Sequence, residues 1–303
     1  MRVLIVGCGY VGLPLGAELV KQSHEVFGLR RSGGGDEDLK TAGIQPLVGN
    51  VTRPDTLAAL PGPFDWVVNT VSSSKGGAAE YREVYLNGTR NLIEWLAPTG
   101  LKRFVYTSST SVYGQADGSM VKETSPTEPA GETSRLLVET EKLLLDTARE
   151  RKFPAVILRV AGIYGPERGH LFLQYLRNEA RIAGKGERII NMIHRDDLVN
   201  VIVAALKNGR LGEIYNATDD EPVAQIHFFR WLSETLGKRM PPFAAEEENT
   251  QRKRGLTNKK VSNRRLKMEL GVQLKYPTFR QGYTAEITRL DREGKLNLAP
   301  EPR

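Results

Sequence analysis

Residues 2–19 read RVLIVGCGYVGLPLGAEL, in which an apolar run passes through three spaced glycines into a helical pattern. Gly7, Gly9 and Gly12 have the GxGxxG spacing that binds dinucleotide phosphates when it joins a first strand to a first helix. Gly7 permits the tight turn, Gly9 lets backbone amides approach a diphosphate, and Gly12 allows close packing of the helix on the strand. We therefore expect a phosphate cradle at the helix N-terminus. The alternative is a glycine turn that binds nothing.

Short β-branched runs and helical patterns alternate through the first half of the chain. After the opening run, the expected strands are HEVFGLR (24–30), GIQPLVGNV (43–51), FDWVVNTV (64–71), KRFVYTSS (102–109) and PAVILRVAGIYG (154–165). Continuous apolar runs separated by helices predict a parallel sheet that is covered on both faces. The expected fold class is therefore α/β, a Rossmann-like doubly wound parallel sheet.

The pattern changes after Gly165, and this change sets the expected domain organisation. Residues 1–165 are expected to form the nucleotide-binding Rossmann domain. Residues 166–303 are more mixed, with a helix expected near 171–183, and should form mostly a smaller C-terminal substrate-binding cap. The segment 190–218, which includes the strand-like run GEIYNAT, is expected to return to the nucleotide domain.

The composition is ordinary for a globular protein of 303 residues, with 40% hydrophobic and 26% charged side chains. We expect no signal peptide, because the apolar run Val3 to Val6 is short, and no run approaches the ~18 apolar residues of a membrane span. Cys8 is the single cysteine, which fits a reducing compartment, so we expect a cytoplasmic protein with no membrane partner. The net charge is +7, but the densest basic cluster, residues 251–267, lacks interleaved aromatics. We expect no nucleic-acid partner, and interpret the cluster as a solvated face or a site for an anionic small molecule.

The second expected strand ends in two arginines that bear on the choice of cofactor. A site for NAD carries an acidic residue near this position, which binds the ribose 2′-hydroxyl. Here Arg30, Arg31 and Ser32 stand there instead. Guanidinium groups form charge-assisted pairs with a 2′-phosphate, so we expect NADP(H) rather than NAD(H), with Tyr10 and Val11 of the glycine loop completing the site. The alternative is two surface arginines in a loop.

Further motifs make the chain resemble the extended short-chain dehydrogenase/reductase superfamily, which includes NAD(P)-dependent epimerases and dehydratases of nucleotide sugars. The resemblance covers nearly the whole length and rests on the glycine loop and on NGTRNL (87–92), FVYTSSTSVYG (104–114), LRVAGIYGP (158–166), IHRDDLV (193–199) and YNATDDEPV (215–223). The glycine loop is one residue shorter than the usual extended form, which is typical of an atypical branch. Members of that branch conserve the active-site tetrad poorly.

The resemblance implies roles for residues at the carboxyl edge of the sheet. Ser109, four residues before Tyr113, matches the serine that hydrogen-bonds the reacting oxygen. Val71 and Ser72 fall where the family lines the ribose and phosphates of the cofactor, and residues 159–164 would flank the nicotinamide.

Two further residues of these motifs have alternative roles. Asn87 matches a buried polar residue that orients the site, and it equally suits a helix cap. His194, followed by Asp196 and Asp197, resembles a catalytic group at first sight. In the family this histidine is structural, and we expect it to cap a helix.

The YxxxK motif of the family is missing from this chain. Its tyrosine is a general acid or base, and its lysine holds the cofactor ribose and lowers the tyrosine pKa. Alignment on Glu139 places Arg135 at the lysine position and Gly131 at the tyrosine position, and none of the ten tyrosines has a lysine four residues later. Arg135 is expected to hold the ribose, but it cannot relay a proton. Glu132 and Tyr164 are the candidates to supply one, with an exposed helix-start carboxylate as the alternative for Glu132.

Two functions fit these observations. The first is an NADP(H)-dependent oxidoreductase or epimerase acting on a small polar substrate, sugar-like or phosphorylated, with Ser109 polarising the reacting oxygen. Loss of a general acid or base typically slows such chemistry by ~10² to 10⁴ without forbidding it. The second is a non-catalytic NADP(H)-binding sensor or partner-binding protein, which the simultaneous loss of tyrosine and lysine favours.

Three expectations concern other ligands and assembly. Basic residues of the cap would receive an anionic substrate or form a solvated helix face, and these are Arg168, Arg177, Arg181 and Lys185. No metal site is expected. Family members often pair through helices of the nucleotide domain, so residues 136–145 would serve either a homodimer interface or the core.

Overall fold

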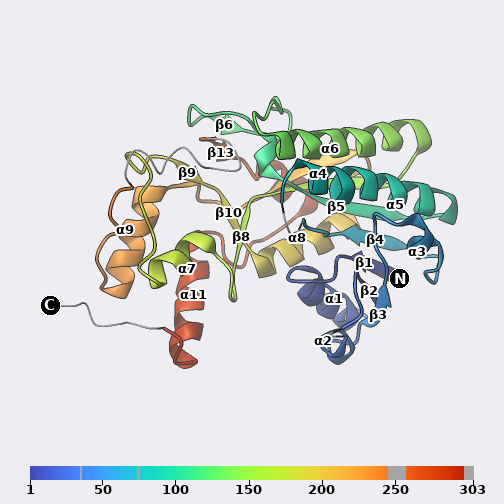
Figure 1. The fold of residues 1–303 in the computed structure, drawn as a ribbon, viewed down its shortest axis with the longest axis horizontal. Helices are drawn as coiled ribbons and strands as arrows, with labels where there is room; N and C mark the ends of the chain where they lie inside the picture. Colours follow the sequence, from blue (N-terminus) through green and yellow to red (C-terminus); the bar gives the residue numbers. More distant parts are fainter. Residues whose placement is uncertain (35, 74–75, 245–256, 297–303) are drawn as a thin grey trace.

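The computed structural model describes residues 1–34, 36–73, 76–244 and 257–296, and a seven-stranded parallel sheet forms its centre (Figure 1). The strand order is β11-β7-β5-β4-β1-β2-β3. The strands are β1 (Arg2–Val6), β2 (Glu25–Arg30), β3 (Gln45–Val48), β4 (Trp66–Asn69), β5 (Arg103–Ser109), β7 (Ala155–Val160) and β11 (Glu213–Ala217). The expected doubly wound α/β fold is confirmed, and each expected strand falls within its predicted run.

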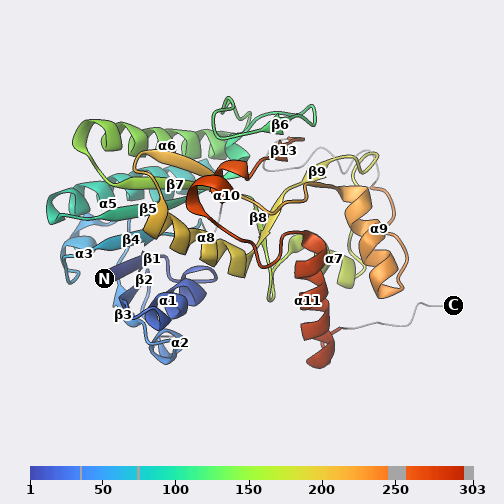
Figure 2. The ribbon, with the colours of Figure 1, turned by 180° about the vertical axis from the view of Figure 1, so that it is seen from behind.

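Helices cover both faces of this sheet (Figures 1 and 2). One face carries α1 (Gly12–Lys21), α2 (Glu37–Thr41), α8 (Arg195–Asn208) and α10 (Arg264–Leu270). The other carries α3 (Pro54–Ala58), α5 (Gly88–Leu96) and α6 (Glu132–Arg151). Successive strand residues point to opposite faces, so Val3 and Ile5 pack in the first layer while Leu4 and Val6 pack in the second. Within α6, Leu136 and Leu144 are buried, so this segment contributes to the core.

A second, smaller unit is built around aromatic side chains. Its helices are α7 (His170–Leu176), α9 (Gln225–Leu236) and α11 (Phe279–Arg292), and Figures 1 and 2 show them grouped to one side of the main sheet. Among the described residues, two short two-stranded sheets accompany them, namely β8 (Gly162–Tyr164) with β10 (Met192–His194), and β9 (Ile189–Ile190) with β12 (Val223–Ala224). A third short sheet, β6 (Met120–Val121) with β13 (Lys260–Val261), packs instead with Leu137 of α6. The buried cluster in this unit includes Phe172, Tyr175, Phe228 and Tyr283.

Parts of the C-terminal half lie with the main sheet. β11 is its edge strand beside β7, and α8 and α10 share the hydrophobic cluster on one of its faces. The helix expected near 171–183 ends at Leu176, since Asn178 has a φ of 59°, which an α-helix does not accommodate. Residues 251–256 of the basic cluster lie outside the described residues. Among the described helices, none has the length and apolar character needed to span a bilayer.

Candidate functional site

A cavity of about 540 Å³ lies at the edge of the sheet where the parallel strands end. Its wall includes residues that end or follow six of the seven strands, namely the glycine loop after β1, Arg30 and Arg31, residues 49–51, residues 70–72, Thr107 to Ser109, and Val160. The carboxyl ends of parallel strands meet at one edge, which is where open α/β sheets bind their ligands. The cavity is therefore the candidate functional site.

The glycine loop forms one end of the cavity with the geometry that its spacing predicts. Gly7 has a φ of 84°, and a Cβ atom there would lie 2.8 Å from the backbone of Val71, which a side chain does not permit. The Gly7 and Cys8 N–H groups donate to the Leu29 carbonyl at 3.0 and 3.1 Å, which ties the loop to β2. Helix α1 begins at Gly12. The Leu13 and Leu15 N–H groups already donate to the Gly9 and Val11 carbonyls and Pro14 has no N–H, so the N–H groups left for an anion are those of Tyr10, Val11 and Gly12. The loop fits a dinucleotide diphosphate.

The two arginines after β2 have different surroundings. The Nε of Arg30 donates to the Cys8 carbonyl at 2.8 Å, and its terminal nitrogens pair with the Asp38 carboxylate at 2.6 and 2.8 Å. The Arg30 guanidinium thereby lowers the pKa of the Asp38 carboxyl. Arg31 lines the cavity, is exposed, and has no hydrogen-bond or ion-pair partner among the described residues. Ser32 is exposed beside it and does not appear in the described cavity wall.

A row of hydroxyl groups forms the middle of the cavity. Thr107, Ser108, Ser109 and Ser111 all line it. The Ser109 Oγ accepts a hydrogen bond from the Ser111 N–H at 3.2 Å, at the start of the short 3₁₀-helix η3 (Thr110–Val112). This bond leaves the Ser109 hydroxyl proton available to a ligand, which is the orientation that polarising an oxygen requires.

A buried polar network lies beneath these hydroxyls. The Ser108 Oγ donates to Glu141 Oε1 at 2.6 Å, and Glu141 pairs with Arg159 at 2.7 Å. Arg159 also donates to the Tyr113 hydroxyl at 2.9 Å, and that hydroxyl donates to Asn216 at 2.8 Å. Burial raises the pKa of Tyr113, so the phenol stays neutral. The network joins α6, β7, β11 and the end of β5.

Helix α6 places different residues at the cavity than the family motif implies. Gly131 immediately precedes the helix, and a Cβ atom added to it would meet no heavy atom within 4 Å. Arg135 is exposed and donates to the carbonyls of Pro129 and Ala130 at 3.2 and 2.6 Å. Glu132 is exposed in the first helical turn. In the described part of the cavity wall, Leu137 is the residue from α6.

Tyr164 does not join this group. Its side chain is 1% exposed, and its ring stacks on Tyr283 of α11 with centroids 4.4 Å apart. Its hydroxyl lies only 2.0 Å from the position that a Cβ atom on Gly282 of α11 would occupy. The phenol therefore points into the packed cap. Burial raises its pKa. The structure thus brings Ser109 to the cavity but not Tyr164, Glu132 or Arg135.

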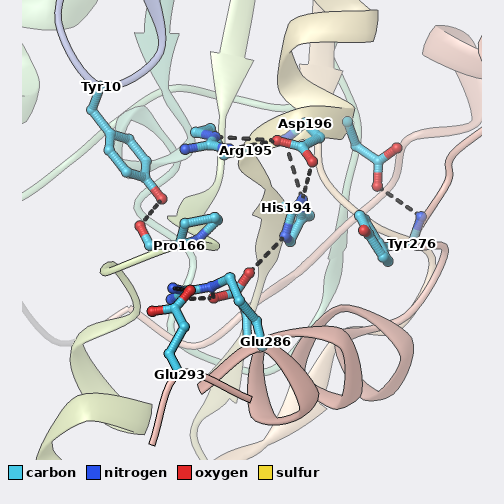
Figure 3. A network of polar contacts seen from close by, with 10 residues as sticks. Tyr10, Pro166, His194, Arg195, Asp196, Tyr276, Glu286 and Glu293 are labelled. Carbon is cyan, nitrogen blue, oxygen red and sulfur yellow. Dashed lines mark hydrogen bonds and ion pairs between the residues drawn. The ribbon is translucent and has the colours of Figure 1, made fainter. Parts of the chain in front are cut away.

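The histidine of the IHRDDLV motif has the capping geometry that we expected. His194 Nδ1 accepts from the Asp196 N–H at 3.1 Å at the start of α8, and its Nε2 lies 3.8 Å from Glu286 Oε1 (Figure 3). Asp197 accepts hydrogen bonds from the N–H groups of Lys275 and Tyr276.

Asn87 fits neither role considered for it, because its side chain bonds Glu83 and Arg90 at the helix surface and makes no cap bond.

A tyrosine of the glycine loop links the cavity to the cap. Tyr10 donates to the Pro166 carbonyl at 3.0 Å (Figure 3), and the guanidinium groups of Arg168 and Arg195 lie 4.8 and 5.3 Å from its ring centre. Burial raises the pKa of Tyr10 to about 12, so its hydroxyl stays a neutral donor.

Of the four basic residues proposed for an anionic substrate, Arg168 lines the cavity. Three are exposed and outside its described wall, namely Arg177, Arg181 and Lys185.

Sequence reasoning missed several residues of the site. Asp38 gave no signal, because its contact with Arg30 depends on how the loop between them folds. The Glu141–Arg159 pair gave none either. Tyr81 and Tyr85 also line the cavity, and their spacing of four residues is the pattern that places two side chains on one helix face.

Comparison with known proteins identifies the family of this chain. The profile of the NAD dependent epimerase/dehydratase family matches residues 3–218. Protein YeeZ of Escherichia coli K12 is 30% identical over 286 residues, which cover 91% of this chain and 96% of that protein. A conserved protein from Silicibacter pomeroyi is 28% identical, with a TM-score of 0.77 over 96% of this chain and 98% of that one. UDP-glucuronic acid 4-epimerase from Bacillus cereus, solved with UDP-glucuronic acid and NAD, shares the fold at 21% identity, with a TM-score of 0.80 over 97% and 100% of the chains.

Replacing Gly7 with alanine should abolish nucleotide binding, because the new methyl group would overlap the Val71 backbone at a φ of 84°. Isothermal titration with NADPH and NADH measures this. Gly131→Ala is the matched control, since its Cβ enters open space, and it should bind both nucleotides as the unchanged protein does. Normal binding by Gly7→Ala would contradict the placement of the diphosphate.

Replacing Glu141 with glutamine should lower the free energy of unfolding by about 3–5 kcal/mol, because it leaves the buried Arg159 charge unpaired. Urea denaturation measures the change. Glu139→Gln, two residues away, removes an exposed carboxylate that lies 3.6 Å from Arg82, and should have little effect. Equal effects of the two substitutions would show that the buried pair is not a structural requirement.

Proposed function

Because the chain belongs to the NAD dependent epimerase/dehydratase family, we propose that it is an NADP(H)-dependent oxidoreductase or epimerase acting on a small, polar, anionic substrate. The observation that supports this most directly is the continuous cavity. It joins a phosphate-binding glycine loop at one end to the row of hydroxyl groups around Ser109 at the other. A dinucleotide is long enough to need both ends, and a substrate then meets its reactive end beside Ser109.

The proposed cofactor interactions follow from the cavity wall. The glycine loop would hold the diphosphate, with Val71 and Ser72 beside the ribose. Arg31 would bind the 2′-phosphate, since its guanidinium has no partner among the described residues. Arg30 would act through the loop instead, because Cys8 and Asp38 already occupy its donors. When bound, the cofactor supplies the hydride acceptor or donor for the reaction.

The proposed substrate site lies between Ser109 and the cap. Ser109 would donate its hydroxyl proton to the reacting oxygen, and Arg168 would attract a negative group of the substrate. A nucleoside diphosphate sugar has both a polar reacting carbon and a diphosphate, and the Bacillus cereus relative was solved with such a compound. We propose this class of compound as the substrate.

A second function is favoured by the position of α6. The helix presents Leu137 to the cavity, while Arg135 bonds the carbonyls of Pro129 and Ala130. A protein that keeps the phosphate cradle and lacks a proton-transferring group on this helix would bind NADP(H) as a sensor. The two functions predict different results with a substrate panel.

The function is tested by titrating NADPH and NADH and then screening bound NADP⁺ with UDP-glucose, UDP-glucuronic acid and dTDP-glucose. Absorbance at ~340 nm reports hydride transfer, and chromatography of the sugar nucleotides reports epimerisation. Tight NADPH binding with conversion of one sugar supports the enzyme. Tight binding with no conversion, together with cofactor-dependent association with another protein, supports the sensor.

Replacing Arg31 with alanine should weaken NADPH binding by about 10- to 100-fold and leave NADH binding unchanged, because it removes a charge-assisted bond to the 2′-phosphate. Isothermal titration measures both. Arg30→Ala is the comparison, and it should weaken both nucleotides alike, because Arg30 holds the glycine loop through the Cys8 carbonyl. An equal loss for NADPH and NADH in Arg31→Ala would remove the 2′-phosphate assignment.

A further inference from the structure

Among the described residues, helix α6, which follows Gly131, presents no proton-transferring side chain to the cavity wall. A Cβ atom on Gly131 would meet nothing within 4 Å, and Leu137 is the α6 residue in the described cavity wall. The candidates from the sequence do not reach the cavity, since Glu132 is exposed and Tyr164 is packed in the cap. A proton donor for the Ser109 site must therefore come from another wall.

The neighbouring wall, formed by α4 (Ala78–Tyr81) and the segment after it, carries two phenols. Helix α4 continues directly into the π-helix η1 (Arg82–Asn87), and Tyr81, Val84 and Tyr85 from this segment line the cavity. The rings of Tyr81 and Tyr85 lie 4.7 Å apart. Single turns of π-helix inside α-helices frequently occur at functional sites, because the wider turn redirects side chains. Here it brings two aromatic side chains to one cavity.

These rings lie beside the part of α6 that faces the cavity. α4 and η1 pack against α6 (Figure 1), and Tyr81 and Tyr85 contact a buried cluster that includes Leu137 and Val112. Val112 belongs to the short helix η3 that Ser109 caps. The same cluster thus joins the two phenols to the segments that carry Ser109 and follow Gly131.

The two hydroxyls differ in their partners. The Tyr85 hydroxyl accepts the Ser73 N–H at 3.1 Å, and Ser73 is in turn bound to Glu80, so Tyr85 is anchored to the loop after β4. The Tyr81 hydroxyl has no hydrogen-bond partner among the described residues, and its side chain is partly exposed. It is therefore available to a ligand and to solvent.

The charged groups around Tyr81 are engaged elsewhere. On its own segment, Glu80 binds Ser73 and the Gly76 N–H, and Arg82 lies 3.6 Å from Glu139 of α6. On α6, Glu141 pairs with buried Arg159, and Arg135 bonds backbone carbonyls. Of the two phenols that line the described part of this wall, Tyr81 is thus the one whose hydroxyl has no partner among the described residues.

We propose that Tyr81 is the general acid and base of this site, in place of the tyrosine that the family carries at the position of Gly131. The proposal rests on the proposed function. In the reducing direction the substrate carbon gains the hydride, the C=O π pair moves to oxygen, and that oxygen takes the proton from the Tyr81 O–H bond. The Tyr81 phenolate then regains a proton from water. Bound NADPH would supply the hydride and its two electrons, the carbonyl would become an alcohol, and Ser109 would polarise the oxygen throughout.

The first test needs no substrate. Phenol ionisation is followed by ultraviolet difference absorbance in the NADP⁺ and NADPH complexes of the full chain. A phenol beside the nicotinamide should ionise at lower pH in the NADP⁺ complex, by about 1 pKa unit or more, because the positive ring stabilises the phenolate. This difference should disappear in Tyr81→Phe and persist in Tyr85→Phe.

Three results would overturn the inference. The difference persisting in Tyr81→Phe would exclude that residue, and its loss in Tyr85→Phe alone would assign the role to Tyr85. Tight NADP⁺ binding with no difference in the unchanged protein would exclude any phenol beside the ring. A failure to bind NADP⁺ at all would instead remove the proposed function on which the inference rests.

The second test returns the phenol to its family position. With whichever of the three sugar nucleotides is converted, Tyr81→Phe should lower kcat by about 10²- to 10⁴-fold with KM little changed. Adding Gly131→Tyr to that variant should restore part of kcat, because the space above Gly131 is open and its φ of −78° suits any residue. An unchanged kcat in Tyr81→Phe would overturn the assignment. A lowered kcat that Gly131→Tyr fails to raise, with KM also changed, would indicate a packing role for Tyr81.

Discussion

The ion pair between Glu141 and Arg159 fixes the three elements that meet beneath Ser109. Glu141 comes from α6, Arg159 from β7, and Ser108 at the end of β5 donates to the same carboxylate. Two charges buried to this degree are stable only when each satisfies the other, so the helix, the strand and the hydroxyl row must keep one mutual arrangement. The cavity and the Ser109 hydroxyl that lines it therefore depend on one fixed arrangement of α6, β5 and β7.

The sequence predicted those parts of the site that depend on the backbone. The glycine spacing and the ends of the strands determine where the loop after β1, Val71 and Ser109 lie, and all of them line the cavity. Side chains on helices were harder to predict. Arg135 and Leu137 are two residues apart on α6, so they project in directions that differ by about 200° around the axis. Alignment of the motif selects Arg135, whereas Leu137, which packs with Val112 and Tyr113, is the residue that lines the cavity.

Long-range charge contacts were the second limit of prediction. Arg30 and Arg31 are adjacent and chemically identical, yet one is paired with Asp38 and bound to the Cys8 carbonyl while the other faces the cavity. This difference depends on the position of α2 relative to β2, and no local pattern encodes it. The likeness to solved structures that hold NAD concerns the fold, whereas the proposed preference for a 2′-phosphate rests on these few side chains at the edge of the cavity.

The cap is assembled from distant parts of the chain, and this has a consequence for biosynthesis. Its aromatic cluster joins Tyr164 and Phe172 to Phe228, and closes only with Phe279 and Tyr283 of α11. The strands of the main sheet are complete by Ala217, so the ribosome releases a finished sheet long before the cap has its last helix. Until then the rings of Tyr164 and Phe228 lack their contacts with Tyr283 and Phe279 of α11. A nascent chain that stalls before residue 279 would therefore leave the aromatic side chains of the cap uncovered and prone to aggregation.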